Sequence, residues 1–244
     1  MPSTPKPDRT RFRIPRIPAL AAVAVLLAAL TVVLTHHVLH DNGLTAIDPE
    51  ISGWAVTHRT AALTVAARVV TTCGGTLTLT IIATLVCAGL VWRGHRGAAV
   101  LVAVTGIGAT ILTVVGKNLV GRSRPPEVDR LAVVNSLSYP SGHSLGSIAV
   151  IGIIAVALTP LLHRAATRIA TVAIAAIFIV AVGLSRVYLG VHWPTDVLGG
   201  WLMGALWIII CVAVYGAAQN RRQRRARPVD IRPTRDRALR RRMT

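Results

Sequence analysis

The sequence predicts an all-α fold, a six-transmembrane-helix bundle with an amphipathic interfacial helix between helices 1 and 2. Of its 244 residues, 53% are hydrophobic and only 15% are charged, and the mean hydropathy is +0.60. This composition is too apolar for an ordinary soluble domain. Six apolar stretches are long enough to cross a hydrocarbon core of about 30 Å as helices. They lie near 17–39, 75–92, 97–116, 142–162, 168–185 and 197–218.

The first stretch, 17–39, follows a basic segment, and this arrangement is also typical of a cleaved signal peptide. Its apolar core is longer than that of most signal peptides, and no small-residue cleavage site follows it. Instead it ends in His36, His37 and His40. We therefore expect an uncleaved first helix, with these histidines at an interfacial turn rather than around a metal ion.

Residues 49–73 are apolar in places but also contain His58, Arg59 and Arg68. Each arginine near the centre of a bilayer costs about 2.5–3.5 kcal/mol. The sequence therefore predicts an amphipathic helix that lies at the outer interface, with Trp54 as its anchor.

The five later stretches carry no Asp, Glu, Lys or Arg at their middles, as transmembrane helices require. Together with the first stretch they form a predicted membrane domain over 17–218. The flanking segments 1–16 and 219–244 are rich in basic residues and contain proline but few apolar residues. Both are therefore predicted to be disordered basic tails, and the second is rich in arginine.

The formal net charge of +18 raises the question of nucleic-acid binding. The basic residues are concentrated in the tails and are not interleaved with aromatic residues, so no nucleic-acid partner is predicted. With six spans, the two tails and the turns near 93–96 and 163–168 lie on the same side of the membrane. That side has 20 basic and three acidic residues, whereas the other side has seven basic and six acidic residues. The positive-inside rule then predicts a multi-pass protein with both termini cytoplasmic. Cys73, Cys87 and Cys211 share no metal-ligand spacing, and no metal site is predicted.

Three short polar motifs lie at predicted helix ends on the opposite, outer side of the membrane. They are Lys117 to Arg124-Pro125, then Pro140-Ser141-Gly142-His143, then Ser185-Arg186 followed by His192 and Asp196. Ionisable residues at a membrane edge are costly to hold, so they usually mark a functional site. Because four helix ends meet on one side, we expect the three motifs to form a single site on the outer face.

The cations Lys117, Arg124 and Arg186 match the charge of about −1.5 to −2 that a phosphate monoester carries. Arginine suits bidentate contacts to phosphate oxygens, and lysine provides a point charge. Ser141 is placed to cap the following helix, and Gly142 lets a ligand approach the backbone closely. Since a helix N-terminus is itself an anion site, all five residues are predicted to bind phosphate.

The other motif residues supply groups for moving a phosphoryl group without a metal or other cofactor. Neutral imidazole attacks phosphorus well, and His192 is the candidate nucleophile. Asp196 lies four residues later and is placed to orient the ring and stabilise its developing positive charge. His143 is the candidate acid and base, which protonates the leaving oxygen and then activates water.

These motifs resemble the three signature blocks of the type 2 phosphatidic acid phosphatase family, membrane enzymes that dephosphorylate lipid phosphates and pyrophosphates. All fixed positions are present, in order and with the same spacing. The resemblance implies the same roles for His192, His143 and Asp196, with a phosphohistidine intermediate. It also implies a cell-membrane enzyme, surrounded by membrane lipids, whose substrate is a lipid phosphate or pyrophosphate such as a polyprenyl pyrophosphate or a phosphatidate.

Two alternatives to hydrolysis stay open at the level of sequence. One is transfer of the phosphoryl group to an alcohol acceptor, and the other is binding of a lipid phosphate without catalysis. Loss of a motif histidine or arginine would favour the second, but all are present. Arg122, inside the first motif, is predicted either to add a phosphate contact suited to a pyrophosphate or to pair with Glu127 or Asp129.

Overall fold

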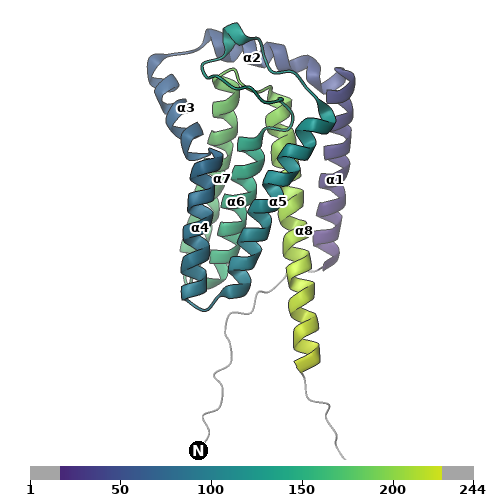
Figure 1. The fold of residues 1–244 in the computed structure, drawn as a ribbon, viewed down its shortest axis with the longest axis vertical. Helices are drawn as coiled ribbons and strands as arrows, with labels where there is room; N and C mark the ends of the chain where they lie inside the picture. The colour runs from purple at the N-terminus through teal and green to yellow at the C-terminus, as the bar shows by residue number, and fades with distance from the viewer. Residues whose placement is uncertain (1–16, 227–244) are drawn as a thin grey trace, which may run out of the picture.

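The computed structural model describes residues 17–226, and that part of the chain consists of α-helices and short 3₁₀ turns, without a strand. The helices are α1 (Ile17–His40), α2 (Asp48–Thr57), α3 (Ala61–Cys73), α4 (Thr76–Trp92), α5 (Arg96–Val120), α6 (Gly142–Leu158), α7 (Ala165–Tyr188) and α8 (Pro194–Ala226). The 3₁₀ turns are η1 (Gly43–Ile47), η2 (Glu127–Asp129) and η3 (Thr159–Leu161). Figure 1 shows the long helices running side by side.

The long helices have the length and the apolar surface of membrane spans. The five helices α1, α5, α6, α7 and α8 are each long and apolar enough to cross a membrane. α3 and α4 together pass the same test as a sixth span, bent by 47°. Large apolar side chains such as Val25, Leu119 and Ile169 are exposed on the outside of the bundle, as a lipid-facing surface requires. The predicted all-α, multi-pass membrane bundle is confirmed.

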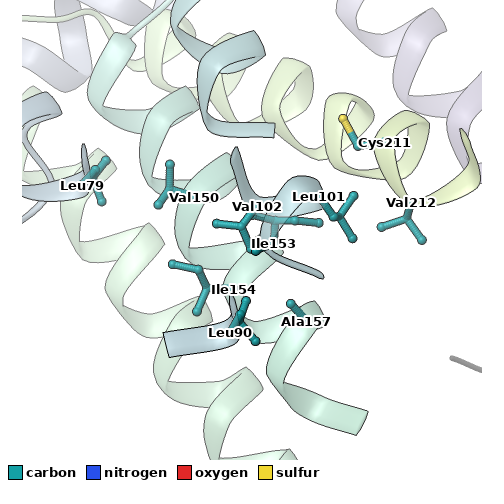
Figure 2. Packing of buried hydrophobic residues seen from close by; sticks show 11 residues of the cluster. Leu79, Leu90, Leu101, Val102, Val150, Ile153, Ile154, Ala157, Cys211 and Val212 are labelled. Carbon is teal, nitrogen blue, oxygen red and sulfur yellow. The ribbon is translucent and has the colours of Figure 1, made fainter. Parts of the chain in front are cut away.

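Helix α6 lies at the centre of the bundle, where it contacts α4, α5, α7 and α8. The main core combines Leu79 of α4, Val102 of α5, Ile153 of α6 and Val212 of α8. Figure 2 shows side chains of this cluster between the helices. Because α6 carries the second polar motif at its first turn, this packing fixes the position of that motif relative to the neighbouring helices.

The segment 49–73, predicted as one interfacial helix, is divided into two helices. α2 lies across the end of the bundle (Figure 1), and its Trp54 is 63% exposed, as expected of an interfacial helix. The chain then turns at Thr60, whose hydroxyl caps α3 by accepting a hydrogen bond from the N–H of Leu63 at 3.2 Å. α3 leads into α4 rather than continuing along the interface.

Arg59 and Arg68, whose charges led to the prediction of an interfacial helix, donate hydrogen bonds to backbone carbonyl groups. Arg59 donates to the carbonyl oxygen of Asp129 at 2.7 Å and to that of Tyr188 at 3.0 Å. Arg68 donates to the carbonyl oxygen of Leu131 at 3.3 Å. Both charges therefore lie against polar backbone from other segments.

The predicted start of the C-terminal tail, after residue 218, falls inside a helix. α8 continues to Ala226, so the first residues of the predicted disordered tail are helical. Alanine, glutamine and arginine have good helix propensity, which lets the helix extend beyond its apolar part. The predicted tail 1–16 and the remainder of the second tail, 227–244, lie outside the described residues.

Candidate active site

The three polar motifs lie at the end of the bundle that α2 crosses. Lys117 is in the last turn of α5, and Arg186 is in the last turn of α7. Gly142 begins α6, and Asp196 is in the first turn of α8. The loop 121–141 crosses the same end (Figure 1) and carries the rest of the first motif.

His192 and Asp196 form a buried pair where α7 turns into α8. Nδ1 of His192 lies 3.3 Å from Oδ2 of Asp196, and the side chains are 2% and 0% exposed. The same carboxylate oxygen accepts hydrogen bonds from the N–H of Trp193 at 2.9 Å and from the hydroxyl of Ser138. Because an acceptor faces Nδ1, that nitrogen carries the ring proton, and Nε2 is left with its lone pair.

Burial keeps the His192 ring neutral. Burial is the largest influence and lowers the pKa of His192 to about 4, and the charges of Arg124 and Arg186 act in the same direction. The hydrogen bond to Asp196 raises the pKa but does not compensate. At neutral pH the unprotonated Nε2 therefore faces Nη1 of Arg124, which lies 3.2 Å away.

The cations Lys117, Arg124 and Arg186 form no ion pair with any residue of 17–226. Arg186 is 5% exposed, and its Nη1 donates to the hydroxyl of Thr71 at 2.6 Å. Its Nε is buried without a hydrogen-bond partner in the described part of the chain. A buried charge that lacks a counter-ion is costly, so this arrangement favours the binding of an anion.

Lys117 and Arg124 are directed at the same stretch of the loop. Nζ of Lys117 lies 3.4 Å from Oγ of Ser136 and also donates to the carbonyl oxygen of Leu137. Arg124 donates to Oγ of Ser136 at 3.1 Å and to the carbonyl oxygen of Leu137 at 3.2 Å. Burial lowers the pKa of Arg124 to about 10, so its guanidinium stays charged at neutral pH. Phosphate oxygens are stronger acceptors for both cations than these neutral groups.

The second motif starts α6 and is tied to the third. The hydroxyl of Ser141 accepts a hydrogen bond from the N–H of Ser144 at 3.4 Å, as an N-cap does. The N–H of Ser141 donates to the carbonyl oxygen of Asp196 at 3.0 Å. A Cβ at Gly142 would lie 3.0 Å from Cγ2 of Thr113, so a small residue lets α5 and α6 approach closely here.

His143 lies in the first turn of α6 and is half-buried. It is within electrostatic reach of four other motif residues, which are Lys117, Arg124, Arg186 and His192. Residues from α5, α6, α7 and the intervening loops are therefore gathered around one point.

Arg122 pairs with two carboxylates, and neither of them was among its predicted partners. Its Nη2 lies 2.7 Å from Oδ2 of Asp48, and its Nη1 lies 2.7 Å from Oδ1 of Asp196. Glu127, one of its predicted partners, pairs with Arg130 at 3.4 Å instead. Asp48 is 74 residues from Arg122, and its one signal in the sequence was a carboxylate at the start of a predicted interfacial helix.

A groove of about 560 Å³, which we call the α4–α6 groove, begins beside the motifs and runs along α4, α5 and α6. Lys117, Ser136 and Gly142 line its end at the site. Mainly apolar or small residues line the rest, including Leu79, Ala83, Val102, Gly106 and Val150. The groove therefore extends from the cation cluster along the apolar surfaces of α4, α5 and α6.

The described residues contain no group of three or more His, Cys, Asp or Glu side chains that could hold a metal ion. At the end of α1, the rings of His36 and His40 are 4.4 Å apart, and His37 bonds to the side chain of Asn42 at 2.9 Å. These histidines therefore interact within their own turn.

The fold and the site define a multi-pass membrane protein in which a neutral histidine, paired with a carboxylate, faces a cluster of cations that have no ion pair in the described part of the chain. The chain belongs to the PAP2 superfamily, whose sequence profile matches residues 97–220. This membership confirms the resemblance seen in the motifs and makes the protein a membrane phosphatase.

Two curated relatives share its sequence. The chain is 33% identical over 171 residues to phosphatidylglycerophosphatase B of Bacillus subtilis, a match that covers 69% of this chain and 83% of the relative. It is 32% identical over 124 residues to undecaprenyl-diphosphatase of Sulfolobus acidocaldarius, covering 49% of this chain and 55% of that protein.

Solved structures share the fold. The crystal structure of a transmembrane PAP2-type phosphatidylglycerolphosphate phosphatase from Bacillus subtilis matches with a TM-score of 0.73 and 30% identity, over 80% of this chain and 96% of that one. LpxE of Aquifex aeolicus matches with a TM-score of 0.55 and 20% identity, over 68% of this chain and 95% of that one. The second likeness concerns the fold alone.

Proposed function

We propose that this protein hydrolyses a lipid phosphate or pyrophosphate at the outer face of the membrane, through a phosphohistidine intermediate and without a metal. The observation that carries the proposal is the unprotonated Nε2 of His192, 3.2 Å from Arg124, beside cations that form no ion pair within residues 17–226. A nucleophile next to a cluster of cations that can bind an anion is the arrangement that phosphoryl transfer needs.

In the first step, the lone pair of Nε2 of His192 attacks phosphorus, and the bond from phosphorus to the lipid oxygen breaks. His143 gives its proton to that oxygen, so the lipid leaves as an alcohol, or as a phosphate from a pyrophosphate. Asp196 holds Nδ1–H and stabilises the positive charge that the ring acquires. The cations and the N-terminus of α6 stabilise the charge on the equatorial oxygens.

In the second step, His143 accepts a proton from water while the water oxygen attacks phosphorus. The bond between phosphorus and Nε2 of His192 breaks, the ring becomes neutral again, and inorganic phosphate leaves. The proton lost by His143 in the first step is thereby restored, so the cycle closes without a cofactor.

The α4–α6 groove supports a substrate with a long apolar tail. A phosphate beside Lys117 would place its first tail carbons at Gly142, and the chain would follow the groove toward Val102. The relatives, by their names, act on phosphatidylglycerophosphate and undecaprenyl diphosphate. We therefore propose a glycerolipid phosphate or a polyprenyl pyrophosphate for this chain.

The distribution of charge supports an outer-face site and cytoplasmic termini. The start of α1, the end of α8 and the turns near 93–96 and 163–168 lie at the end of the bundle opposite α2 (Figure 1). In the sequence, the two basic tails adjoin the start of α1 and the end of α8, so the positive-inside rule favours a cytoplasmic location for that end. The motifs are at the other end.

The test is phosphate release by the purified protein from phosphatidate, phosphatidylglycerophosphate and a polyprenyl pyrophosphate, with and without EDTA. We expect release from at least one lipid, no effect of EDTA, and inhibition by vanadate, which mimics a five-coordinate phosphoryl group. His192→Ala should abolish release, whereas His163→Ala, an exposed histidine at the opposite end, should not. Full activity in His192→Ala would remove the proposed nucleophile.

The same assay separates the two alternatives. If the phosphoryl group passes to an alcohol, adding the acceptor should lower phosphate release while consumption of the lipid continues. A non-catalytic binder would bind the lipid phosphate without consuming it.

A further inference from the structure

Asp48, at the start of α2, lies inside the site although it belongs to none of the three motifs. Its side chain is almost fully buried, and its Oδ1 accepts a hydrogen bond from the N–H of Thr195 at 3.0 Å. Its Oδ2 accepts a second bond from the hydroxyl of Thr195 at 2.5 Å. Because Thr195 is in the first turn of α8, Asp48 caps that helix from a different segment of the chain.

Arg122 joins this carboxylate to the one beside the proposed nucleophile. Its Nη2 donates to Asp48 at 2.7 Å, and its Nη1 donates to Asp196 at 2.7 Å and to the hydroxyl of Thr195 at 2.7 Å. Its side chain is only 10% exposed. Burial works against the charged guanidinium, yet the carboxylates raise the pKa of Arg122 above its ordinary value. A planar fork with two donor nitrogens is required, because the two partners are separate carboxylates.

We infer that Asp48 and Arg122 are positioning residues. They hold the Asp196 carboxylate in the orientation in which it bonds to His192, and they do not bind phosphate. This inference rests on the proposed role of His192 as nucleophile. Oδ1 of Asp196 is held by Arg122, while Oδ2 bonds to Nδ1 of His192. The carboxylate is therefore fixed from both sides, and the ring has a single orientation.

The network also sets the charge behind the nucleophile. Asp48, Arg122 and Asp196 together carry one negative charge, which equals the positive charge that His192 gains when Nε2 bonds to phosphorus. If Arg122 were removed, the carboxylates of Asp48 and Asp196 would lie near each other without a cation between them. Removing one partner of a buried network is therefore expected to disturb the orientation of the whole network.

The test compares Arg122→Gln, Arg122→Lys and Asp48→Asn with wild type, using phosphate release from phosphatidate in detergent micelles. We expect kcat to fall roughly 10–100-fold, as for other residues that orient a catalytic ligand, with KM changed less than about 3-fold. Arg122→Lys should restore little, because one ammonium cannot bridge two carboxylates. Glu127→Gln and Arg93→Gln, which lie outside the site, are matched controls.

The acid limb of the kcat/KM profile gives a readout that a purely structural role would not produce. The charged or titratable groups within reach of His192 are Asp196 of α8, Arg124 of the loop, Arg186 of α7 and His143 of α6. Losing the Arg122 cation strengthens the field of the Asp196 carboxylate, so Arg122→Gln should move the acid limb to higher pH. Losing the Asp48 charge leaves Arg122 less compensated, so Asp48→Asn should move it to lower pH.

The double variant Arg122→Gln with Asp196→Asn decides whether Arg122 acts through Asp196. We expect it to be no slower than Asp196→Asn alone by more than about 3-fold. Multiplicative losses, or a large rise in KM, would show that Arg122 contacts phosphate directly and would overturn the inference. Wild-type kcat in Arg122→Gln would overturn it as well. Thermal unfolding and size-exclusion profiles normalise each rate to folded protein. Activity of His192→Ala reports separately on the proposed function.

Discussion

Nη1 of Arg124 lies 3.2 Å from Nε2 of His192, so the nitrogen proposed to attack phosphorus points at a guanidinium. The same guanidinium also donates to the carbonyl oxygens of Val191 and Leu137. A phosphate that enters between the cations therefore meets the nucleophile and its electrostatic stabilisation at one place. Because the phosphate would bind to Arg124 in front of Nε2 of His192, the site would need little reorganisation before the nitrogen attacks phosphorus.

Arg124→Gln should lower kcat/KM about 100- to 1,000-fold, as loss of one transition-state donor does elsewhere. Arg124→Lys should recover only part of this, since an ammonium cannot reproduce the fork that faces several acceptors at once. Vanadate inhibition should weaken in parallel, because the lost contacts are to the phosphoryl oxygens. Equal vanadate sensitivity in Arg124→Gln and wild type would exclude Arg124 from the phosphate site.

The enzyme should stay active well below the pH at which an ordinary histidine is protonated. Because burial lowers the pKa of His192 to about 4, the neutral ring persists through pH 5. The acid limb of kcat/KM is therefore expected near pH 4 rather than near 6.5. Asp196 raises this pKa, so Asp196→Asn should shift the limb to lower pH while kcat falls by about 1,000-fold or more. A limb near 6.5 in wild type would indicate a different essential group.

His143→Asn should accumulate a covalent intermediate. With a substrate whose leaving group needs no proton, such as p-nitrophenyl phosphate, the first step proceeds, but the attack of water lacks its base. Mass spectrometry of the quenched protein should find phosphate on the peptide that contains His192, stable to base and labile to acid. Phosphate on another residue, or none in any variant, contradicts the two-step mechanism.

Filling the α4–α6 groove should impair long-chain substrates selectively. A Cβ at Gly106 would lie 3.7 Å from Val150, an ordinary contact, so Gly106→Leu fits locally while its side chain enters the groove. We expect KM for a long-chain lipid phosphate to rise about 10-fold or more, consistent with the loss of several buried CH₂ groups, and a much smaller effect on a short soluble ester. Gly89→Leu, where nothing lies within 4 Å, is the control. Equal losses on both substrates would argue that the tail lies elsewhere.

The sequence by itself determined that the chain is a multi-pass helical membrane protein, and it predicted the chemistry of the motifs. A span requires only a contiguous apolar stretch of sufficient length, which is why the predicted stretch 97–116 is found inside α5. The roles of the motif residues were predicted from their types and spacing, and they stay predictions. His192 and Asp196, four residues apart, belong to this local class.

Only the tertiary structure decided the partners that reach the site from distant segments. Asp48 meets Arg122 and Thr195 because α2 folds across the end of the bundle, and no pattern within α2 encodes that contact. The acceptors of Arg59 and Arg68 are likewise carbonyl groups of distant segments, at residues 129, 131 and 188. Hydropathy is a property of one segment, whereas desolvation depends on the segments that pack against it.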